Sequence, residues 1–546
     1  MDRDKQPVLI VGGSLVGLSA AMFLAWRGVP TILVEQYPGS SLHPRAIGYT
    51  LRTIELFRAV GLDVSAFSDK FISATGGKLR RARVESLAGK WFEETLWTPE
   101  DSAKKENEAT EVEYSPCTSR GIAVAQDRLE PLLRDRAVQL GAELRLETEL
   151  VSFEQDDEGV TASLRDRRKG GEIYSLRASY MIAADGNRSS IREALGIERS
   201  GRGYIRTMGS VLFRAPLDEY LASGVRQFDI DHPDGFKGFL TTYGDGRWVL
   251  MYSVAKDNTE KPDEATLKAM IEKAVGRSYL PIEIITTGQW EMNALIADRF
   301  SSGRVFLAGD AAHTLPPNRG GYGANTGIED VHNLAWKLQA VLSGVSRPQL
   351  LETYDAERRP IGWLRLRQIF ARSDYKAHAD SKNVETAVIE DIAMEIGQLY
   401  RSDAVLGAGE DLLPAMRPDQ WKGQPGTRAP HVWISKKPSS EPISTLDLFQ
   451  KGWVLLADDE KWVSAASEAS RQLGVDLTCL HIGMDFIPSS VTEKDLREDY
   501  GLIGHGGALL VRPDGYVAWR AVDLPSDPID TLKSGLGRVS HAKIHS

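Results

Sequence analysis

Cysteine is scarce in this sequence, which has only Cys117 and Cys479 among its 546 residues. Two thiols far apart in the chain cannot build a disulfide framework or a cysteine-based metal site, so we expect a protein of the reducing cytoplasm. The ten histidines form no metal-binding pattern either. The sequence therefore predicts that no metal ion takes part in the function.

Net positive charge and membrane-length apolar runs are also lacking. A formal net charge of -10 and a sequence pI near 5.6 disfavour binding to nucleic acid or to an anionic membrane surface. The short, charged N-terminus leads straight into a strand-like run, so we expect no signal peptide. The apolar stretch 18–26 is far shorter than the roughly 20 residues needed to cross a bilayer. These features predict a soluble protein.

The length and the apolar content are sufficient for several hydrophobic cores. With 42% hydrophobic and 26% charged residues the sequence is typical of a globular protein, and its length suggests about two to four domains. Residues 8–11 and 31–34 are buried strand-like runs, and residues 15–27 between them have helical spacing. The chain is therefore predicted to begin with a βαβ unit.

Short alternating patterns in the middle of the chain predict antiparallel strands. Residues 150–153 and 160–164 flank an Asp-Asp-Glu-Gly turn, and residues 236–243 and 247–254 flank Gly-Asp-Gly. We interpret residues 201–293 as a mainly antiparallel sheet inserted into the first domain. A strand at 304–308 and a helix at 326–342 then return to that domain. A Pro- and Gly-containing linker at 406–426 leads to a small α/β domain.

A glycine-rich turn joins the first strand to the first helix. Residues 12–17 read Gly-Gly-Ser-Leu-Val-Gly, and Glu35 ends the second strand eighteen residues after Gly17. In a dinucleotide fold the glycines let the backbone approach a pyrophosphate at the helix N-terminus, while the carboxylate binds a ribose. Ser14 stands where glycine is usual, which narrows the anion site but keeps its N–H. Alone this could be an ordinary tight turn; with the acidic residue it predicts dinucleotide binding.

Two further motifs follow strand-like runs. Residues 185–192 begin with Asp-Gly and by themselves are typical of a strand, a turn and a capped helix. Residues 309–313 (Gly-Asp-Ala-Ala-His) continue through Pro-Pro into the glycine-rich stretch 320–327. Asp310 could bind the hydroxyls of a ribityl chain. The N–H groups of the glycine-rich loop, at a helix N-terminus, suit the electron-rich pyrimidine edge of a reduced flavin.

These three motifs, in this order, resemble those of the single-component FAD-dependent aromatic hydroxylases, the class A flavoprotein monooxygenases. The resemblance covers about residues 8–405, with supporting matches at 43–46, 126–133, 354–360 and 397–405. The last two, with 333–338, resemble the phenol and polyketide hydroxylase branch in particular. A thioredoxin-like domain ends the chain in that branch, and residues 506–516 resemble its closing hairpin.

The resemblance implies an α/β fold in three parts. A Rossmann-like FAD-binding domain with a helical extension would comprise 1–200 and 294–405, with a substrate-binding β-sheet domain inserted at 201–293. After the linker, residues 427–546 would form the thioredoxin-like domain. That domain has no Cys-x-x-Cys, which excludes thiol–disulfide chemistry. We expect it to serve a structural role or to form a homodimer.

The resemblance also implies the chemistry. NADPH (or NADH) would reduce the FAD, and O2 would add to give a flavin C4a-hydroperoxide. Its distal oxygen would be transferred to an electron-rich carbon of a small aromatic substrate, a phenol or a polyketide. The protein must orient that substrate and keep the hydroperoxide dry.

Cofactor-binding roles follow from the same resemblance. The 12–17 turn would hold the pyrophosphate, Glu35 the adenosine ribose, and Asp310 the ribityl side. Arg45 would neutralise the pyrophosphate or line the path of the flavin, and Gln126 would bind near the ring system or the ribityl chain. Asp185 and Arg188 would fix the pyrophosphate region or dock the reductant. Pro316 would face the flavin C4a region through its carbonyl, and residues 321–325 would face the pyrimidine edge. The predicted cofactor-binding residues are Gly12, Gly13, Ser14, Gly17, Glu35, Arg45, Gln126, Asp185, Arg188, Asp310, Pro316, Gly321, Gly323, Ala324 and Asn325.

One departure from the family pattern concerns the loop before the long helix. Asn318 and Arg319 stand where a single residue is usual. Which loop N–H groups would contact the flavin therefore stays open.

Large side chains on or near the inserted sheet are the predicted wall of the substrate pocket. They are Tyr49, Phe239, Tyr243, Trp248, Met251 and Tyr252. Because side chains alternate along a strand, only about half of them can face the pocket. His313 follows a buried strand, so we expect it to bond to backbone rather than act as an acid or base. No residue is singled out as a catalytic base.

Three other functions stay open. A Baeyer–Villiger oxygenase or an epoxidase would use nearly the same motifs and differ only in its product. An NAD(P)-dependent dehydrogenase would use the 12–17 turn alone, and the motif around Asp310 argues against it. A non-catalytic flavin-binding protein would consume no NAD(P)H.

Overall fold

The structure is a computed structural model of the chain. It describes residues 6–64, 80–96, 113–117, 121–168, 170–256, 260–317, 321–372, 387–436 and 440–543. Within these ranges, no helix combines the length and the apolar character needed to cross a bilayer.

A six-stranded sheet forms the centre of the N-terminal part, in the order β17-β18-β11-β1-β2-β7. All neighbouring strands pair in parallel except the short edge strand β17. The strands are β1 (Val8–Val11), β2 (Thr31–Glu35), β7 (Glu143–Leu146), β11 (Tyr180–Ala183), β17 (Ser301–Ser302) and β18 (Val305–Leu307). Together with α1 (Leu15–Trp26), β1 and β2 confirm the predicted βαβ unit. The carboxyl ends of the parallel strands meet at one edge, where ligands bind in open α/β sheets.

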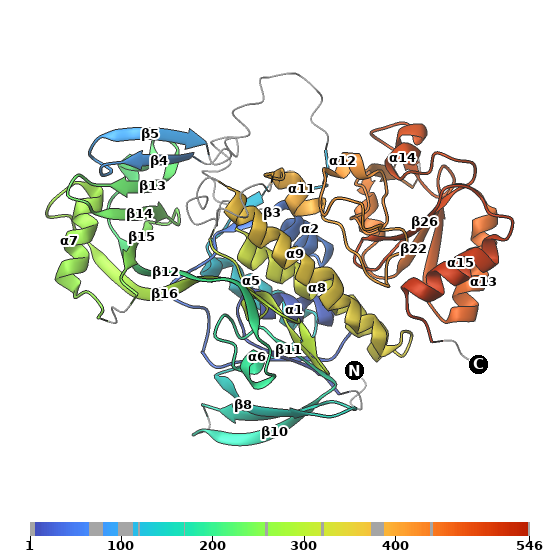
Figure 1. Ribbon diagram of the computed structural model, residues 1–546, viewed down its shortest axis with the longest axis horizontal. Coiled ribbons are helices and arrows are strands. Elements are labelled where there is room, and N and C mark those ends of the chain that lie inside the picture. The colour runs from blue at the N-terminus through green and yellow to red at the C-terminus, as the bar shows by residue number, and fades with distance from the viewer. Residues whose placement is uncertain are drawn as a thin grey trace.

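Helix α1 packs between α5 (Gln126–Gln139) and α8 (Tyr322–Leu342). Ten of its twelve residues are buried, and apolar residues cover nearly its whole circumference, because α5 and α8 lie on two sides of it and the sheet lies on a third. Outside the main sheet, β8 (Thr148–Gln155), β9 (Val160–Asp166) and β10 (Glu172–Ala178) form the predicted hairpin and one further strand (Figure 1). The short helix α6 (Ser190–Ala194) follows β11.

An eight-stranded sheet forms the second part, in the order β19-β16-β12-β15-β14-β13-β4-β5. It is antiparallel apart from the pair β13 and β4, as predicted in the main. Helix α7 (Glu264–Val275) covers one face (Figure 1). The strands are β4 (Arg80–Val84), β5 (Trp91–Leu96), β12 (Arg199–Arg214), β13 (Val225–Asp231), β14 (Lys237–Thr242), β15 (Arg247–Val254), β16 (Glu283–Ala297) and β19 (His313–Thr314). Strands β4 and β5 come from a segment that the sequence analysis assigned to the FAD-binding domain.

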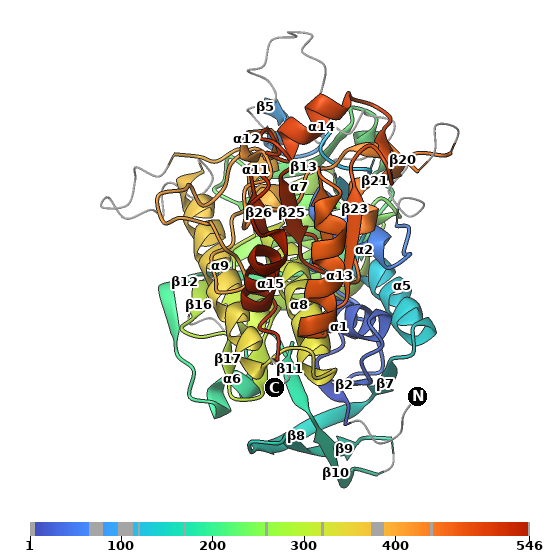
Figure 2. The ribbon, with the colours of Figure 1, turned by 90° about the vertical axis from the view of Figure 1, so that its right-hand side faces the viewer.

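Two long helices cross the middle of the molecule, between the eight-stranded sheet and the C-terminal part (Figures 1 and 2). These are α8 and α9 (Glu352–Ala371), and they pack on each other. Helix α8 begins four residues earlier than the predicted 326. Beside its first turn lie the two-stranded sheet of β3 (Gly48–Thr50) and β6 (Gly121–Ala123), and the helices α2 (Leu51–Ala59) and α11 (Asp391–Ile396).

A four-stranded sheet with two packed helices forms the C-terminal part, which is the predicted small α/β domain. The sheet order is β23-β22-β25-β26, and α13 packs against α15. Its larger elements are β22 (Trp453–Ala457), α13 (Lys461–Leu473), β23 (Leu477–His481), α14 (Glu493–Asp499), β25 (Ala508–Val511), β26 (Val517–Ala521) and α15 (Pro528–Val539). A small sheet beside them contains β20 (Trp433–Ser435), β21 (Ile443–Ser444) and β24 (Ile487–Pro488).

The predicted linker at 406–426 is a packed segment rather than a free tether. It contains α12 (Pro418–Trp421), and the buried Trp421 donates its indole N–H to the Gly397 carbonyl at 2.8 Å. The N–H of Leu406 bonds to Ala518 and that of Gly426 to Val517, both on β26. The Pro and Gly residues of this segment lie in a closely packed backbone. Composition alone cannot distinguish such a segment from a flexible linker.

Candidate functional site

The glycine turn after β1 is formed by close backbone packing. Gly12 has φ +111°, and a Cβ on it would lie 2.3 Å from the Ala184 carbonyl oxygen. A Cβ on Gly17 would lie 1.8 Å from the carbonyl oxygen of Gly12. Side chains are thus excluded at both positions. The turn leads into α1, where the N–H groups of the N-cap Ser14 and of Leu15, Val16 and Gly17 have no partner within the helix and point to the same edge of the sheet.

Glu35 lies directly beside this turn. Its Oε2 accepts a hydrogen bond from the Gly13 N–H at 2.6 Å, and its Oε1 accepts one from the Tyr37 N–H at 2.9 Å. Each carboxylate oxygen keeps a further lone pair. The end of β2 therefore holds an oriented acceptor next to the glycine turn, the arrangement that a ribose diol requires.

Ser14 and Gln126 belong to one polar cluster. The Ser14 hydroxyl donates to Glu130 Oε1 at 2.6 Å, and the Gln126 amide donates to the same oxygen at 2.7 Å and to Ser14 at 2.9 Å. Gln126 Oε1 accepts the N–H groups of Arg45 at 3.1 Å and of Ala46 at 3.2 Å. Gln126 therefore fixes the 45–46 backbone to the glycine turn. Sequence analysis missed Glu130, although its spacing of four from Gln126 on α5 places both on one helix face.

Residues 309–313, which we call the Asp310 loop, lie against the first turn of α1. Gly309 has φ +59°, and a Cβ on it would be 2.8 Å from Val16, while one on Gly327 would be 2.5 Å from the same side chain. The Asp310 side chain is exposed to solvent, yet the surrounding protein limits its hydration and raises the pKa of its carboxyl, which His313 and Arg45 partly oppose. The Asp310 carboxylate is therefore accessible to a ligand.

The expected backbone bond of the His313 side chain is wrong. Its Nε2 bonds instead to Asp330 Oδ2 at 2.7 Å, and both side chains are fully buried. Burial alone would raise the pKa of Asp330, but His313 and Arg358 hold that pKa below its usual value. Asp330 is therefore ionised and accepts only, so His313 Nε2 carries the proton. Asp330 Oδ2 also accepts the Gly309 N–H at 3.2 Å, which ties this loop to α8.

The first turn of α8 presents N–H groups to open space. Gly321 is the N-cap with φ +56°, and a Cβ on Gly323 would meet no atom of the described residues within 4 Å. The N–H groups of Gly321, Tyr322, Gly323 and Ala324 have no partner within the helix. The N-terminal donors of a helix suit the edge of a flat, electron-rich ligand.

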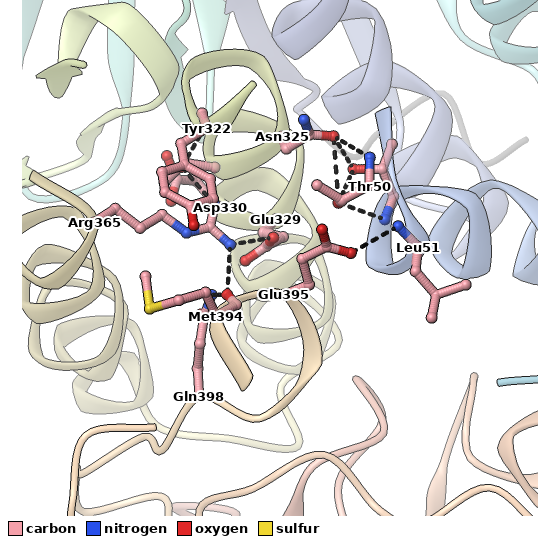
Figure 3. A network of polar contacts seen from close by, with 12 residues as sticks. Thr50, Leu51, Tyr322, Asn325, Glu329, Asp330, Arg365, Met394, Glu395 and Gln398 are labelled. Carbon is pink, nitrogen blue, oxygen red and sulfur yellow. Dashed lines mark hydrogen bonds and ion pairs between the residues drawn. The ribbon is translucent and has the colours of Figure 1, made fainter. Parts of the chain in front are cut away.

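Asn325 is a clamp for this turn (Figure 3). Its amide donates to the carbonyls of Gly321 at 2.8 Å and Gly48 at 3.2 Å. Its Oδ1 accepts from the Thr50 N–H at 3.0 Å and from the Thr53 hydroxyl at 2.6 Å. The side chain is fully buried. Its side chain therefore has a structural task, which explains why α8 starts at Tyr322.

The Asp185 motif borders the glycine turn from β11. A Cβ on Gly12 would lie 3.2 Å from the Asp185 N atom. Asp185 Oδ1 is buried without a hydrogen-bond partner in the described part of the chain, and burial raises the pKa of this carboxyl. Arg188 is exposed. The buried Arg192, which sequence analysis did not single out, donates to the carbonyls of Asn187 and Ala311 and so joins this motif to the Asp310 loop.

Pro316, which follows the Asp310 loop and precedes α8 in the sequence, is buried. The predicted departure at Asn318 and Arg319 lies outside the described residues.

The predicted substrate residues divide between the two faces of the eight-stranded sheet. Trp248 is fully buried in the core beneath α7. Tyr252 points to the same side and lines a cavity together with Gly209 and Gly288. Phe239 pairs with Met251 across β14 and β15 on the opposite face. The residues divide in this way because successive side chains of a strand point to opposite faces of the sheet, as the sequence analysis expected.

The remaining two tyrosines lie at the junction of the two parts. The Tyr243 hydroxyl donates to the Pro44 carbonyl at 2.8 Å. Tyr49 is buried, its hydroxyl has no partner among the residues that the structure describes, and burial raises its pKa well above the usual value. A Cβ on Gly288 would lie 3.4 Å from the His43 ring. Residues 43–46 therefore span the gap between the sheet and the Gln126 cluster.

Comparisons with known proteins agree with this arrangement. Residues 5–368 match the family described as FAD binding domain, and residues 422–540 match the aromatic-ring hydroxylase C-terminal domain. The chain is 39% identical to 4-methyl-5-nitrocatechol 5-monooxygenase of a Burkholderia species, over 98% of this chain and 97% of the relative. It is also 39% identical to tetracenomycin A2 monooxygenase-dioxygenase of Streptomyces glaucescens, over 99% and 97%. The crystal structure of aklavinone-11 hydroxylase with FAD and aklavinone superposes with a TM-score of 0.84 at 36% identity, covering 99% of both chains.

Proposed function

This chain belongs to the FAD-dependent aromatic-ring hydroxylases, and from that premise we propose that its substrate is a phenolic ring within a fused, polyketide-like ring system. The relatives that act on tetracenomycin A2 and aklavinone support the polycyclic choice, and the nitrocatechol relative supports the phenolic one. The enzyme is an FAD-dependent monooxygenase, so it uses reduced nicotinamide and O2 as co-substrates.

The observation that carries this proposal is the convergence of three motifs beside one face of the eight-stranded sheet. Val16 contacts the positions of Gly309 and Gly327, while Gly12 abuts Ala184. Residues 43–46 connect this edge to the sheet face that carries Phe239 and Met251. A flat ring between that face and the cofactor site would have an apolar wall on one side and the flavin on the other.

We assign the cofactor contacts as follows. The N–H groups at the start of α1 would hold the pyrophosphate, with Arg45 as its counter-charge, and Glu35 would accept from the adenosine ribose. Asp310 would accept from the ribityl hydroxyls. Within residues 321–325, Gly323 and Ala324 would donate their N–H groups to the pyrimidine edge.

When bound, FAD supplies the electron transfer from nicotinamide and the transfer of one oxygen atom to the substrate. The chain contributes binding and orientation. Tyr49 keeps its proton at neutral pH because burial raises its pKa, so toward a ligand it would donate or accept a hydrogen bond as a neutral phenol and would not act as a phenolate base. Asp185 and Arg188 remain our proposal for the pyrophosphate region or for docking of the reductant.

The test is substrate-dependent NADPH oxidation measured together with oxygen uptake. Simple phenols and polycyclic hydroxyquinones are compared, and the product is examined by mass spectrometry after turnover in isotopically labelled O2. We expect strong stimulation by a polycyclic phenol and one labelled hydroxyl group in the product. Hydrogen peroxide as the sole oxygen product with every ligand would overturn hydroxylation, and a lactone product would indicate Baeyer–Villiger chemistry.

We also propose that the protein works in the cytoplasm. Cys117 and Cys479 are both unpaired, and burial raises the pKa of their thiols to about 11 and about 12. Thiols held in the protonated form are slow to oxidise and have no catalytic use here. A homodimer remains a proposal that the C-terminal domain would serve, and light scattering of the purified holoenzyme would test it.

A further inference from the structure

The hairpin turn between β25 and β26 is buried in the N-terminal part of the molecule. Arg512 donates to both carboxylate oxygens of Glu357, at 2.6 and 3.0 Å, and both side chains are fully buried. The indole of Trp336 on α8 donates to Asp514 at 3.1 Å. Arg27, at the end of α1, donates to the Pro513 carbonyl at 2.8 Å. The turn thus inserts among α1, α8 and α9, and it contacts the helices that surround the cofactor site.

A continuous series of contacts leads from this turn to the Asp310 loop. The ring of Tyr516 stacks on Tyr400 with 4.2 Å between centroids and 12° between planes. The Tyr400 hydroxyl accepts a hydrogen bond from Arg358 Nη1 at 2.7 Å, and Arg358 Nε donates to Asp330 Oδ1 at 2.8 Å. The other oxygen of Asp330 holds the Gly309 N–H and the His313 ring.

We propose that Tyr516, Tyr400, Arg358 and Asp330 form a positioning relay through which the C-terminal domain sets the place of the Asp310 loop against the flavin. The inference rests on the proposed role of Asp310 in holding FAD. It gives the C-terminal domain, which lacks Cys-x-x-Cys, a function in cofactor binding.

The two carboxylate oxygens of Asp330 bind different partners, and this is how a change at Arg358 would reach the Asp310 loop. One carboxylate oxygen faces Arg358 and the other faces the loop, so a displaced guanidinium turns the carboxylate away from Gly309. All members but Tyr516 are at most 2% exposed, and no bulk water screens the charges or replaces a lost partner. Arg358 also donates to Glu329 and to the Thr326 carbonyl, so its guanidinium can shift toward these partners when Tyr400 no longer accepts from it, and its charge stays paired.

The test compares two identical substitutions at buried tyrosines of the full-length holoenzyme. Tyr400→Phe removes the acceptor of Arg358 and keeps the stacked ring. Tyr500→Phe is the matched control, because the buried Tyr500 hydroxyl donates to the Pro430 carbonyl at 2.6 Å, within the C-terminal part and away from the relay. We expect Tyr400→Phe to weaken FAD binding about tenfold and Tyr500→Phe to change it less than about twofold, at a similar loss of thermal stability.

Two readouts separate positioning from a general loss of structure. Hydrogen exchange of a peptide covering residues 305–313 reports the Gly309 N–H directly, and visible circular dichroism reports the surroundings of the bound flavin. Both should change in Tyr400→Phe and remain as in the wild type in Tyr500→Phe. Equal changes in the two variants, or none in either, would overturn the relay.

A second variant covers the case in which Tyr400→Phe does not accumulate as folded protein. Tyr516→Leu removes the stacked ring from the C-terminal side and should give the same weaker FAD binding and faster exchange at Gly309. Unchanged FAD affinity in a folded Tyr516→Leu protein would contradict the relay. These measurements need no substrate, so their failure is distinct from a failure to find a hydroxylated product.

Discussion

Asp310 and Asn325 show how differently two polar residues of one motif can serve a site. Asp310 is exposed, and its side chain has no hydrogen-bond partner among the residues that the structure describes. The buried Asn325 instead uses its amide and its carbonyl oxygen to hold chain segments together. Accessible and partnerless polar atoms are those left for a ligand. We therefore expect loss of Asp310 to affect binding and loss of Asn325 to affect folding.

Replacement of Asp310 by alanine should sharply weaken FAD retention without unfolding the protein. The ribityl hydroxyls lose a charged acceptor, which corresponds to about 1.5–3 kcal/mol of binding energy. Flavin content after gel filtration and the FAD dissociation constant are the measurements. Asn325→Ala is the contrast, with a lower unfolding midpoint of the FAD-free protein. A full flavin complement in Asp310→Ala would remove the assignment.

Glu395 on α11 predicts a pH dependence of stability. Its Oε2 accepts the Leu51 N–H at 3.2 Å at the start of α2 (Figure 3), and burial, together with nearby Asp391, raises its pKa from 4.5 to about 8. Between these values the unfolded chain releases the proton and the folded protein keeps it. The stability that Glu395 contributes is therefore complete below pH 4.5 and lost as the pH rises toward 8.

Glu395→Gln should remove this dependence, because glutamine keeps the acceptor for Leu51 and never ionises. The variant should be more stable than the wild type at pH 8, and the difference should shrink toward pH 5. Urea unfolding at several pH values measures it. Glu410→Gln, at an exposed position, is the control and should give a constant difference. A constant difference for Glu395→Gln as well would contradict the prediction.

At the scale of the element, a substitution in the first turn of α8 should have opposite effects on protein stability and on FAD affinity. A methyl group at Gly323 meets no atom within 4 Å in the part of the chain that the structure describes, so Gly323→Ala should stabilise the FAD-free protein by about 0.5–1 kcal/mol through helix propensity. The same methyl would occupy the space proposed for the pyrimidine edge, and FAD affinity should fall about tenfold or more.

A matched glycine on another helix controls for this experiment. At Gly535 on α15 a Cβ would lie 3.5 Å from the Trp519 ring, an ordinary contact distance. Gly535→Ala should therefore give a similar stabilisation with unchanged FAD affinity. Isothermal titration of FAD and chemical unfolding of the apoprotein measure both quantities. Wild-type affinity in Gly323→Ala would place the flavin edge elsewhere.

Elements formed by neighbours in sequence were predictable, and those formed by distant partners were not. The limits of β1 agree with the prediction because a buried apolar run ends at a glycine turn. The start of α8 was missed because its glycine-rich first turn has low helix propensity and is held by contacts from Asn325 to Gly48. Likewise β4 joins β13, about 145 residues further along the chain, and no local pattern reveals that pairing.

The candidate site was predictable only where a motif marks it. The glycines and the acidic residues Glu35 and Asp310 lie at one sheet edge as expected from their spacing. Asp330 was overlooked, although a charged residue in a mostly buried helix is a signal, because its partners His313 and Arg358 come from other segments. Trp248 was listed for the pocket wall but lies in the core beneath α7, because aromatic content does not indicate which face of the sheet a side chain occupies.

At the scale of the whole molecule, buried ion pairs join the C-terminal part to the rest. Glu357 receives Arg512, Lys337 and Asn333, and these charges are inaccessible to solvent. Arginine and lysine hold the pKa of the Glu357 carboxyl far below its usual value, against the effect of burial. Removal of one partner leaves the others uncompensated, which is costly in a dry interior.

Arg512→Ala should therefore lower the free energy of unfolding by about 3 kcal/mol or more. It should also split thermal unfolding into two transitions, since the two parts lose their strongest polar connection. Arg471→Ala, which breaks an exposed pair with Glu468, is the control and should cost less than about 1 kcal/mol. Differential scanning calorimetry measures both effects. A single transition near that of the wild type in Arg512→Ala would show that apolar packing alone joins the parts.

The insertion of the β25–β26 turn also orders events during protein synthesis. Gly12, Glu35 and the Asp310 loop are synthesised long before the turn whose Arg512 and Tyr516 contact the surrounding helices and Tyr400. If the proposed relay holds, we expect the FAD site to be completed only after more than five hundred residues have been made. A ribosome-bound nascent chain that stops short of residue 512 should retain flavin poorly, and truncated products would be distinguished from finished enzyme by their lack of colour.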